Sequence, residues 1–180
     1  MIETRRLFLR EMTESDFAAL RAVLSDPLAM AHYPAPLSDE KVRGWIAWNL
    51  DNYAAYGFGL WAVCLKPTGE VIGDCGVTMQ RIRGRIRPEI GYHIRRDLWR
   101  RGYAKEAAAA CRDYIFENTP FRTVYSYMNR ANAASSATAR AIGMRLVDRY
   151  EEAGEPTDVY AVTRTEWARR RVPADRTADE

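Results

Sequence analysis

Short segments in which apolar and polar residues alternate occur along most of the chain, and each predicts a β-strand. Two of these segments are joined by Lys66-Pro67-Thr68-Gly69. Proline presets φ and glycine tolerates φ above zero, so this connection predicts an antiparallel hairpin. The predicted strands are residues 3–12, 58–65, 71–79, 88–95, 123–128, 144–150 and 157–165.

Apolar residues spaced three and four apart predict helices between these strands. The helices are residues 13–25, a segment from Ser38 to the glycine at 57, the segment from Gly102 to Thr119, and residues 133–142. Thr13 with Asp16 is typical of a helix start, and Gly143 of a helix end. The mixed order of strands and helices predicts an α/β fold, with one domain over residues 1–168 and a polar tail over 169–180.

Composition narrows the class of protein. The chain has 180 residues, of which 47% are hydrophobic and 28% charged, as expected for one globular domain. No apolar run is long enough to cross a bilayer and the N-terminus lacks a signal peptide, so we expect a cytoplasmic protein. The net charge of +3 favours local anion sites over a broad nucleic-acid surface. The three cysteines lack metal-ligand spacing, and we expect no metal site.

The segment 98–107 predicts an anion site. Gly102 stands before an alanine-rich helix, where free N–H groups and the positive end of the helix dipole attract phosphate. Arg100, Arg101 and Lys105 add positive charge, and Arg95 or Arg96 could reach further phosphates. The alternative is an ordinary helix start, since neither a P-loop nor a Gly-x-Gly-x-x-Gly motif is present.

Two further segments favour a ligand. Gly91, inside the strand 88–95, predicts a bulge or a close backbone approach, where a linear amide such as a pantetheine arm could pair with the strand. Asn132 and Ser135 are placed at the start of a helix. The alternatives are a core strand with a glycine for packing, and helix capping alone.

Together these segments resemble the GNAT superfamily of acetyl-CoA-dependent N-acetyltransferases, and its RimJ/RimL-like branch more closely. Similar motifs occur in the same order over residues 3–168: the opening strand at 3–10, the strand 89–94, the loop and helix start at 99–107, Asn132 with Ser135, Gly143-Met144, and a closing strand at 160–167. The resemblance implies a mixed, mostly antiparallel sheet of six to seven strands flanked by about four helices.

The resemblance also implies acetyl-CoA as co-substrate. The implied binding residues are Tyr92, His93, Ile94, Arg95, Arg100, Arg101, Gly102, Tyr103, Ala104, Lys105, Asn132 and Ser135. Trp99 departs from the superfamily motif and fits the RimJ/RimL-like branch. Ala139 stands where many members carry a tyrosine that acts as general acid.

The implied reaction is direct attack of a primary amine on the thioester. Glu89 is the first candidate for the general base, with His93 and Tyr92 as alternatives; a surface ion pair is the other interpretation of Glu89. By resemblance, a backbone N–H near His93 or Ile94 would polarise the carbonyl. Ser135 could protonate the leaving thiolate.

The acceptor amine stays open: a protein N-terminus or a small molecule such as an antibiotic or a polyamine. Tyr33, Trp45 and Trp48 could line its groove, although they could also belong to the core. The arginine-rich run 81–87 could be a hairpin that attracts an acidic substrate, or a solvated face. A non-catalytic acyl-CoA sensor and an RNA-associated module are the rival functions, and a homodimer is an open alternative for its assembly.

Overall fold

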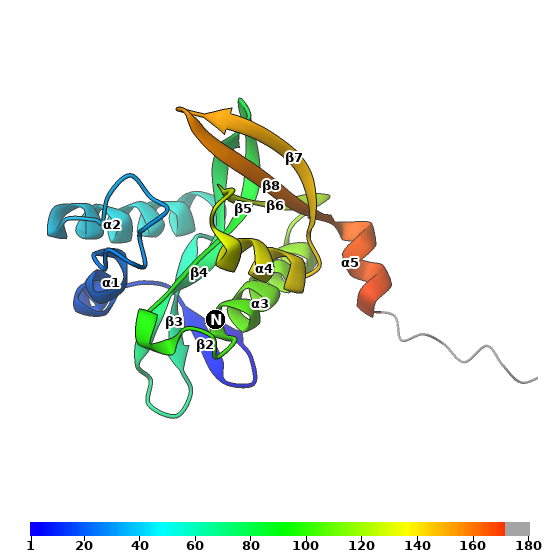
Figure 1. Cartoon of the computed structure of the whole chain (residues 1–180). Helices are drawn as coiled ribbons and strands as arrows, with labels where there is room; N and C mark the ends of the chain where they lie inside the picture. The colour runs from blue at the N-terminus through cyan, green and yellow to red at the C-terminus, as the bar shows by residue number, and fades with distance from the viewer. Residues whose placement is uncertain (172–180) are drawn as a thin grey trace, which may run out of the picture.

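The computed structural model describes residues 1–171 and contains one eight-stranded sheet in the order β1-β2-β3-β4-β5-β6-β8-β7 (Figure 1). Every neighbouring pair is antiparallel except β5 and β6, which run parallel. The strands are β1 (Ile2–Glu3), β2 (Leu7–Arg10), β3 (Leu60–Leu65), β4 (Val71–Ile82), β5 (Arg85–Ile94), β6 (Thr123–Asn129), β7 (Arg145–Glu152) and β8 (Glu155–Thr163).

Helices cover both faces of this sheet (Figure 1). They are α1 (Phe17–Leu24), α2 (Asp39–Tyr56), α3 (Tyr103–Asn118), α4 (Ala133–Ala141) and α5 (Arg164–Arg171), with 3₁₀ turns at Glu14–Asp16 and Arg96–Leu98. Alternation along β3 explains the two layers. Trp61 and Val63 join the core beneath α3 and α4, whereas Leu60 and Ala62 join the core beneath α1 and α2. None of the described helices is long and apolar enough to cross a membrane.

The predicted fold class is confirmed, with more strands and helices than expected. The strand predicted over 3–12 is two strands, because the chain turns at Thr4, whose N–H donates to the Leu7 carbonyl at 2.9 Å. The arginine-rich run 81–87 is itself a hairpin, which extends β4 and β5 to a turn at Arg83 and Gly84. The residue at that turn, Arg83, has a positive φ of 49°.

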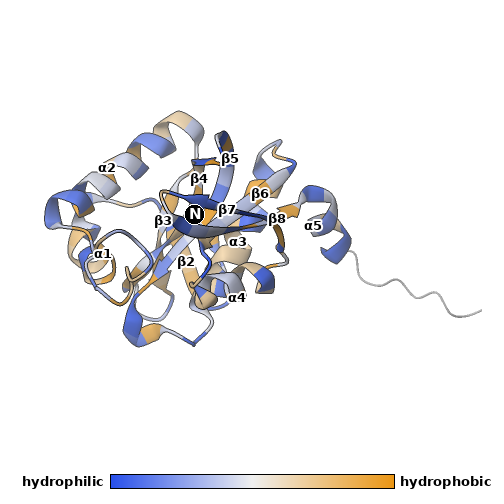
Figure 2. Ribbon diagram, turned by 45° about the horizontal axis from the view of Figure 1, so that its top comes forward, coloured by the Kyte–Doolittle hydropathy of each residue, from blue (hydrophilic) through white to orange (hydrophobic). Residues whose placement is uncertain are grey.

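The closing strand is shorter than predicted, because a fifth helix begins after Thr163. Glu166 accepts hydrogen bonds from the backbone N–H and the hydroxyl of Thr163, at 2.8 and 2.7 Å, which caps the start of the helix. Trp167, predicted in the strand, therefore lies in α5. Residues 169–171, predicted as tail, also belong to α5, and the rest of that predicted tail lies outside the described residues. Figure 2 shows the mainly hydrophilic colour of this helix.

The sheet opens between β5 and β6. Glu89 pairs with Tyr125, and no further β5 residue pairs with β6 in the described chain. The edge of β5 that faces β6 is therefore free of strand partners from Ile90 to Ile94. The bulge predicted at Gly91 is absent, because β4 and β5 stay in register from Gly73 opposite Ile94 to Ile82 opposite Arg85.

Candidate active site

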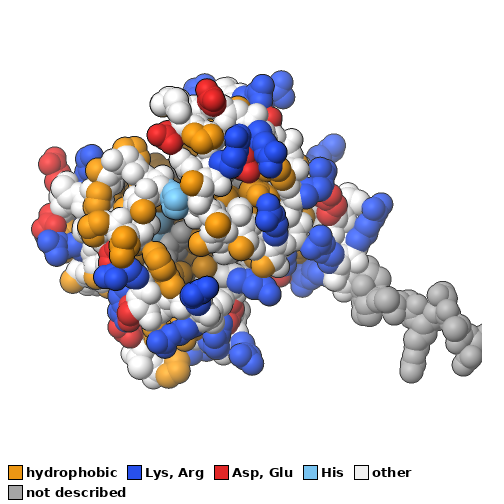
Figure 3. Space-filling view, viewed as in Figure 1, with side chains coloured by type: hydrophobic (Ala, Val, Ile, Leu, Met, Phe, Trp, Pro, Cys, Tyr) orange, Lys and Arg blue, Asp and Glu red, His pale blue; other side chains and the backbone are white. Residues whose placement is uncertain are grey.

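A cavity of about 790 Å³ lies where β5 and β6 diverge. Figure 3 shows the molecule hollowed between α2 and the strands, with histidine in pale blue at the opening. Its lining includes Tyr33, Trp45 and Trp48 from the α2 side, Gln80 from β4, Glu89, Tyr92 and His93 from β5, Tyr127 from β6, Asn132 and Ser135 at α4, and Glu152 and Glu155 beside the β7–β8 turn.

Glu89 is the buried carboxyl group of the cavity. Glu89 is 8% exposed. Its carboxyl group forms no ion pair or hydrogen bond with any described residue. Burial raises the pKa of Glu89 to about 8, because the charged form loses its hydration. The alternative of a surface ion pair is therefore wrong. Gly91 leaves room for the carboxyl group, since a Cβ there would lie 3.3 Å from Glu89 Oε2.

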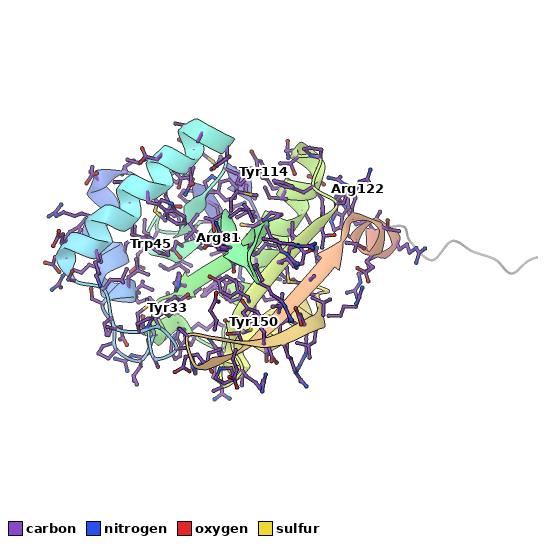
Figure 4. The ribbon with its side chains drawn as sticks, turned by 90° about the horizontal axis from the view of Figure 1, so that it is seen from above. Tyr33, Trp45, Arg81, Tyr114, Arg122 and Tyr150 are labelled. Carbon is purple, nitrogen blue, oxygen red and sulfur yellow. The ribbon has the colours of Figure 1, made fainter. Side chains whose placement is uncertain are left out.

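His93 belongs to a hydrogen-bonded network that sequence reasoning did not find. His93 Nδ1 lies 2.7 Å from Asp74 Oδ1 on the neighbouring strand, and Nε2 lies 2.7 Å from the Tyr33 hydroxyl. The Trp45 indole N–H donates to Asp74 Oδ2 at 2.8 Å. Asp74 is fully buried, and its two oxygens are thereby satisfied. Figure 4 shows Tyr33 and Trp45 on the α2 side of the sheet.

Tyr92 crosses the gap between β5 and α4. Its hydroxyl donates to the Ser135 carbonyl at 2.9 Å, while Ser135 donates its backbone N–H to Asn132 Oδ1 at 3.0 Å. Asn132 is thus the N-cap of α4, as the sequence predicts. Ala139, at the position where a tyrosine is common, is fully buried.

The loop before α3 has the geometry of an anion site. Arg100 and Gly102 both adopt positive φ, 62° and 80°. No described group accepts a hydrogen bond from the backbone N–H groups of residues 100–105, and the first bond of the helix runs from Glu106 N–H to the Gly102 carbonyl at 3.0 Å. Six successive amides are therefore free for a ligand at the positive end of a 16-residue helix.

Neighbouring side chains brace this loop. Arg6 donates to the Arg101 carbonyl at 2.9 Å and to Glu106 at 2.6 Å, and its guanidinium stacks 4.4 Å above the ring of Tyr103. The Trp99 indole donates to the Ile94 carbonyl at 2.6 Å, which ties the loop to the end of β5. Ala104 is half-buried in the first turn of the helix.

The basic side chains near the loop divide into two groups. Arg100, Arg101 and Lys105 are exposed and make no ion pair among the described residues. Arg95 is held by Asp97 at 2.7 Å and by Glu70 at 2.6 Å, so its guanidinium is occupied by two carboxylates. Arg96 is similarly paired with Asp26 at 2.9 Å.

The structure thus gathers the predicted residues in two places. Glu89, Tyr92, His93, Asn132 and Ser135 line one cavity, and the loop residues follow directly from the end of β5. Sequence reasoning missed Asp74, Glu152 and Glu155. For Asp74, the available signal was a charged residue inside an apolar strand. Nothing in the sequence distinguishes Glu152 and Glu155 from the other acidic residues near the β7–β8 turn.

An opened sheet edge and a helix terminus with free amides can bind a ligand, and a buried carboxyl group beside them can transfer a proton. A model of the acetyltransferase (GNAT) domain family matches residues 6–145. The chain belongs to this family and is an acetyltransferase.

Curated relatives and solved structures agree. The Bacillus subtilis protein YkkB is 37% identical over 87% of this chain and 92% of its own length. The uncharacterized N-acetyltransferase p20 of Bacillus licheniformis is 30% identical over 87% of this chain and 91% of its own. The crystal structure of an acetyltransferase from Agrobacterium tumefaciens is similar at a TM-score of 0.79 and 30% identity, over 89% of this chain and 92% of that one.

Proposed function

We propose that this acetyltransferase takes the acetyl group from acetyl-CoA and transfers it to a primary amine by direct attack. The observation that carries the proposal is the continuity of two backbone surfaces: the β5 edge from Ile90 to Ile94, which has no strand partner, leads directly to the free amides of residues 100–105. A pantetheine arm would pair along the strand edge, and its pyrophosphate would meet the amides.

The cavity supplies the groups that this reaction needs. Glu89, ionised above pH 8, would take a proton from the ammonium form of the acceptor. Free N–H groups at the β5 edge near His93 would polarise the thioester carbonyl. Ser135 would donate a hydrogen bond to the departing thiolate. Holding both reactants in one cavity contributes much of the rate, about 7–11 kcal/mol in favourable cases.

The sequence motifs that resemble the RimJ/RimL-like branch support membership of this protein in that branch. A ribosomal-protein-serine acetyltransferase-like protein from Vibrio cholerae shares the fold at a TM-score of 0.73 and 22% identity.

Thermal unfolding with acetyl-CoA tests the donor site. Gly102→Glu should abolish the stabilisation by acetyl-CoA, because it adds negative charge and disturbs a residue at φ 80°. At acetyl-CoA about 100 times its Kd, the parent should gain about 2.7 kcal/mol. Gly69→Glu is the control, because Gly69 has a similar φ of 71° with no atom within 4 Å of its added Cβ, in the β3–β4 turn.

Equal stabilisation of the parent and Gly102→Glu would show that the loop does not bind the pyrophosphate. Release of the CoA thiol in the presence of acetyl-CoA and a panel of amines tests the transfer. Tight binding of acetyl-CoA without release of CoA with any amine would favour the sensor alternative.

A further inference from the structure

The cavity around Glu89 carries a charge opposite to that of the whole molecule. Three carboxyl groups line it: Glu152 and Glu155 on either side of the β7–β8 turn, and Glu89 on β5, which adds its charge above about pH 8. No lysine or arginine is among its lining residues within the described chain, although the protein has 27 basic residues and a net charge of +3.

The two glutamates of the turn keep their charge uncompensated. Glu152 accepts from the Tyr150 hydroxyl at 3.1 Å, and Glu155 accepts from the Asn129 amide at 2.8 Å. Both donors are neutral. On the same hairpin, Asp158 instead meets two arginines, Arg130 at 2.9 Å and Arg149 at 3.4 Å.

Two arginines of the neighbouring hairpin are engaged with other groups. Arg83 forms an ion pair with Asp148 on β7 at 2.9 Å, and the guanidinium of Arg87 stacks 4.5 Å above the ring of Tyr125. No residue of the run 81–87 lines the cavity, although the adjacent Gln80 does. The prediction that this run attracts an acidic substrate therefore gains no support from the cavity.

Glu89, Glu152 and Tyr127 of β6 line the same cavity. Burial raises the pKa of the Tyr127 phenol to about 12, and the carboxyl groups of Glu89 and Glu152 raise it further. Ionised carboxylates on these walls would attract a cation.

The opposite wall is aromatic. Trp45 and Trp48 lie with ring centroids 5.4 Å apart, and Tyr33 completes the wall. Figure 4 shows Trp45 and Tyr33 toward α2 and Tyr150, the partner of Glu152, on the β7–β8 side. Aromatic faces bind alkyl chains and ammonium groups alike, and about 790 Å³ suits a small molecule.

We propose that the acceptor is a small linear amine with a second positive charge, of the di- or polyamine class. The reacting amine would lie at Glu89, the alkyl chain along the tryptophans, and the distal ammonium near Glu152 and Glu155. This inference rests on the acetyl transfer proposed above.

The step balances without a further reagent. One proton passes from the reacting ammonium to Glu89, and the nitrogen electron pair forms a bond to the thioester carbon. The C–S bond then breaks, the second proton leaves the nitrogen for the thiolate, and the products are the monoacetylated amine and the CoA thiol.

A matched series of four-carbon amines tests the distal charge by release of the CoA thiol. It comprises 1,4-diaminobutane, 4-aminobutanol, butylamine and 4-aminobutanoate. The expected order of kcat/KM places the diamine first and the carboxylate last, with about a threefold to tenfold loss for each charge interaction removed. The double variant Glu152→Gln/Glu155→Gln should remove most of the preference for the diamine over butylamine. Glu151→Gln, exposed beside the turn and not part of the lining, is the control.

Equal kcat/KM for the diamine and butylamine, or an unchanged ratio in the double variant, would overturn the inference. So would a peptide with lysine at its second position that reacts faster than every diamine. If no amine releases CoA, the proposed transfer fails instead. Calorimetry then tests the charge recognition, and equal affinities for diamine and butylamine would overturn it.

Discussion

Glu89 combines two properties that rarely occur together, deep burial and the absence of a charged partner. A buried carboxyl group keeps its proton to a higher pH than a solvated one, and here burial raises the pKa to about 8. A base with this pKa is matched to the deprotonation of an amine near neutral pH. The same shift also makes the stability of the protein depend on pH.

Glu89→Gln should change the shape of the pH profile as well as the rate. With an acceptor whose amine pKa is near ~10.4, kcat/KM of the parent should rise to about pH 8 and then level off. The variant should lose roughly 10²- to 10⁴-fold at pH 8, and its rate should keep rising toward pH 10, because only the free amine then reacts. A plateau at the same pH in the variant would exclude Glu89 as the base. Glu151→Gln should behave as the parent.

The stability effect has a definite sign. Because the pKa of Glu89 is higher in the folded state, folded protein holds a proton that unfolded protein releases between about pH 4.3 and 8. Its stabilising contribution is complete below this window and is lost as the pH rises through it. Urea unfolding should therefore show Glu89→Gln gaining stability relative to the parent between pH 5 and pH 9, by about 1.4 kcal/mol per pKa unit at most. A constant difference over this range would contradict the assigned shift.

At the scale of elements, one network joins the aromatic wall of the acceptor cavity to β4 and β5. Tyr33 belongs to the segment between α1 and α2, and its hydroxyl meets His93 of β5. Asp74 of β4 holds the other nitrogen of His93 and the indole of Trp45 of α2. Asp74 therefore orients the histidine and the tryptophan together, and Tyr33 fixes the loop over the cavity.

Tyr33→Phe should loosen this loop without disturbing the donor site. We expect KM for the acceptor to rise by about threefold to tenfold, the cost of one hydrogen bond near ~1 kcal/mol, while KM for acetyl-CoA stays constant. Steady-state kinetics with each substrate varied in turn measures both. A parallel rise in both KM values would show a general loss of structure instead.

The pairing of β3 with β4 depends on Gly76. A Cβ at this residue would lie 2.0 Å from the Gly59 carbonyl oxygen and 2.7 Å from Leu60 Cα, both of which belong to the backbone. Gly76→Ala should therefore destabilise the protein by at least about 2 kcal/mol, because the strands must separate. Gly44→Ala in α2 has no atom within 4 Å of its added Cβ and should stabilise by about 0.5–1 kcal/mol. Denaturant unfolding of both variants checks the contrast.

Local signals explain which elements the sequence predicted. Ser38 and Gly57 border α2 where expected, with Ser38 accepting from the Lys41 N–H and Gly57 at φ 74°. The break at Thr4 depends on a carboxylate that is distant in the sequence, because Glu106 accepts from Thr4 and Arg6, which are 102 and 100 residues away. The start of α5 depends on Glu166, which accepts from the backbone N–H of Thr163. Alternation alone carries no information about such contacts, so these segments were predicted as continuous strands.

The donor side of the candidate site was more predictable than the acceptor side. The loop around Gly102 and the cap at Asn132 are contiguous motifs, and their geometry follows from neighbouring residues. The acceptor cavity is assembled from α2, β4, β5, β6 and the β7–β8 turn. The charge of the cavity depends on which carboxylates lack an arginine partner. Arginines and acids alternate along the sequence, so only the structure shows that Asp158 is paired with arginines and Glu152 is not.

At the scale of the whole molecule, the two substrates would meet opposite potentials. The free amides before α3 lie beside Arg100, Arg101 and Lys105, whereas the acceptor cavity is lined by carboxylates. A polyanionic donor and a cationic acceptor would thus each be attracted to its own site and repelled from the other. A modest net charge of +3 conceals this division.

Ionic strength should expose the division. Exposed charges are screened over about 10 Å at 0.1 M salt, so KM for acetyl-CoA should rise several-fold between about 0.05 and 0.5 M salt. In Arg100→Ala/Lys105→Ala the initial KM should be higher and the dependence on salt shallower, because less charge remains to be screened. Arg122→Ala is the control, since Figure 4 shows this exposed arginine beside α5, on the side of the molecule away from Tyr33. Parallel salt curves for the parent and the double variant would mean that the phosphates are held by the backbone amides alone, which screening affects far less than it affects exposed side chains.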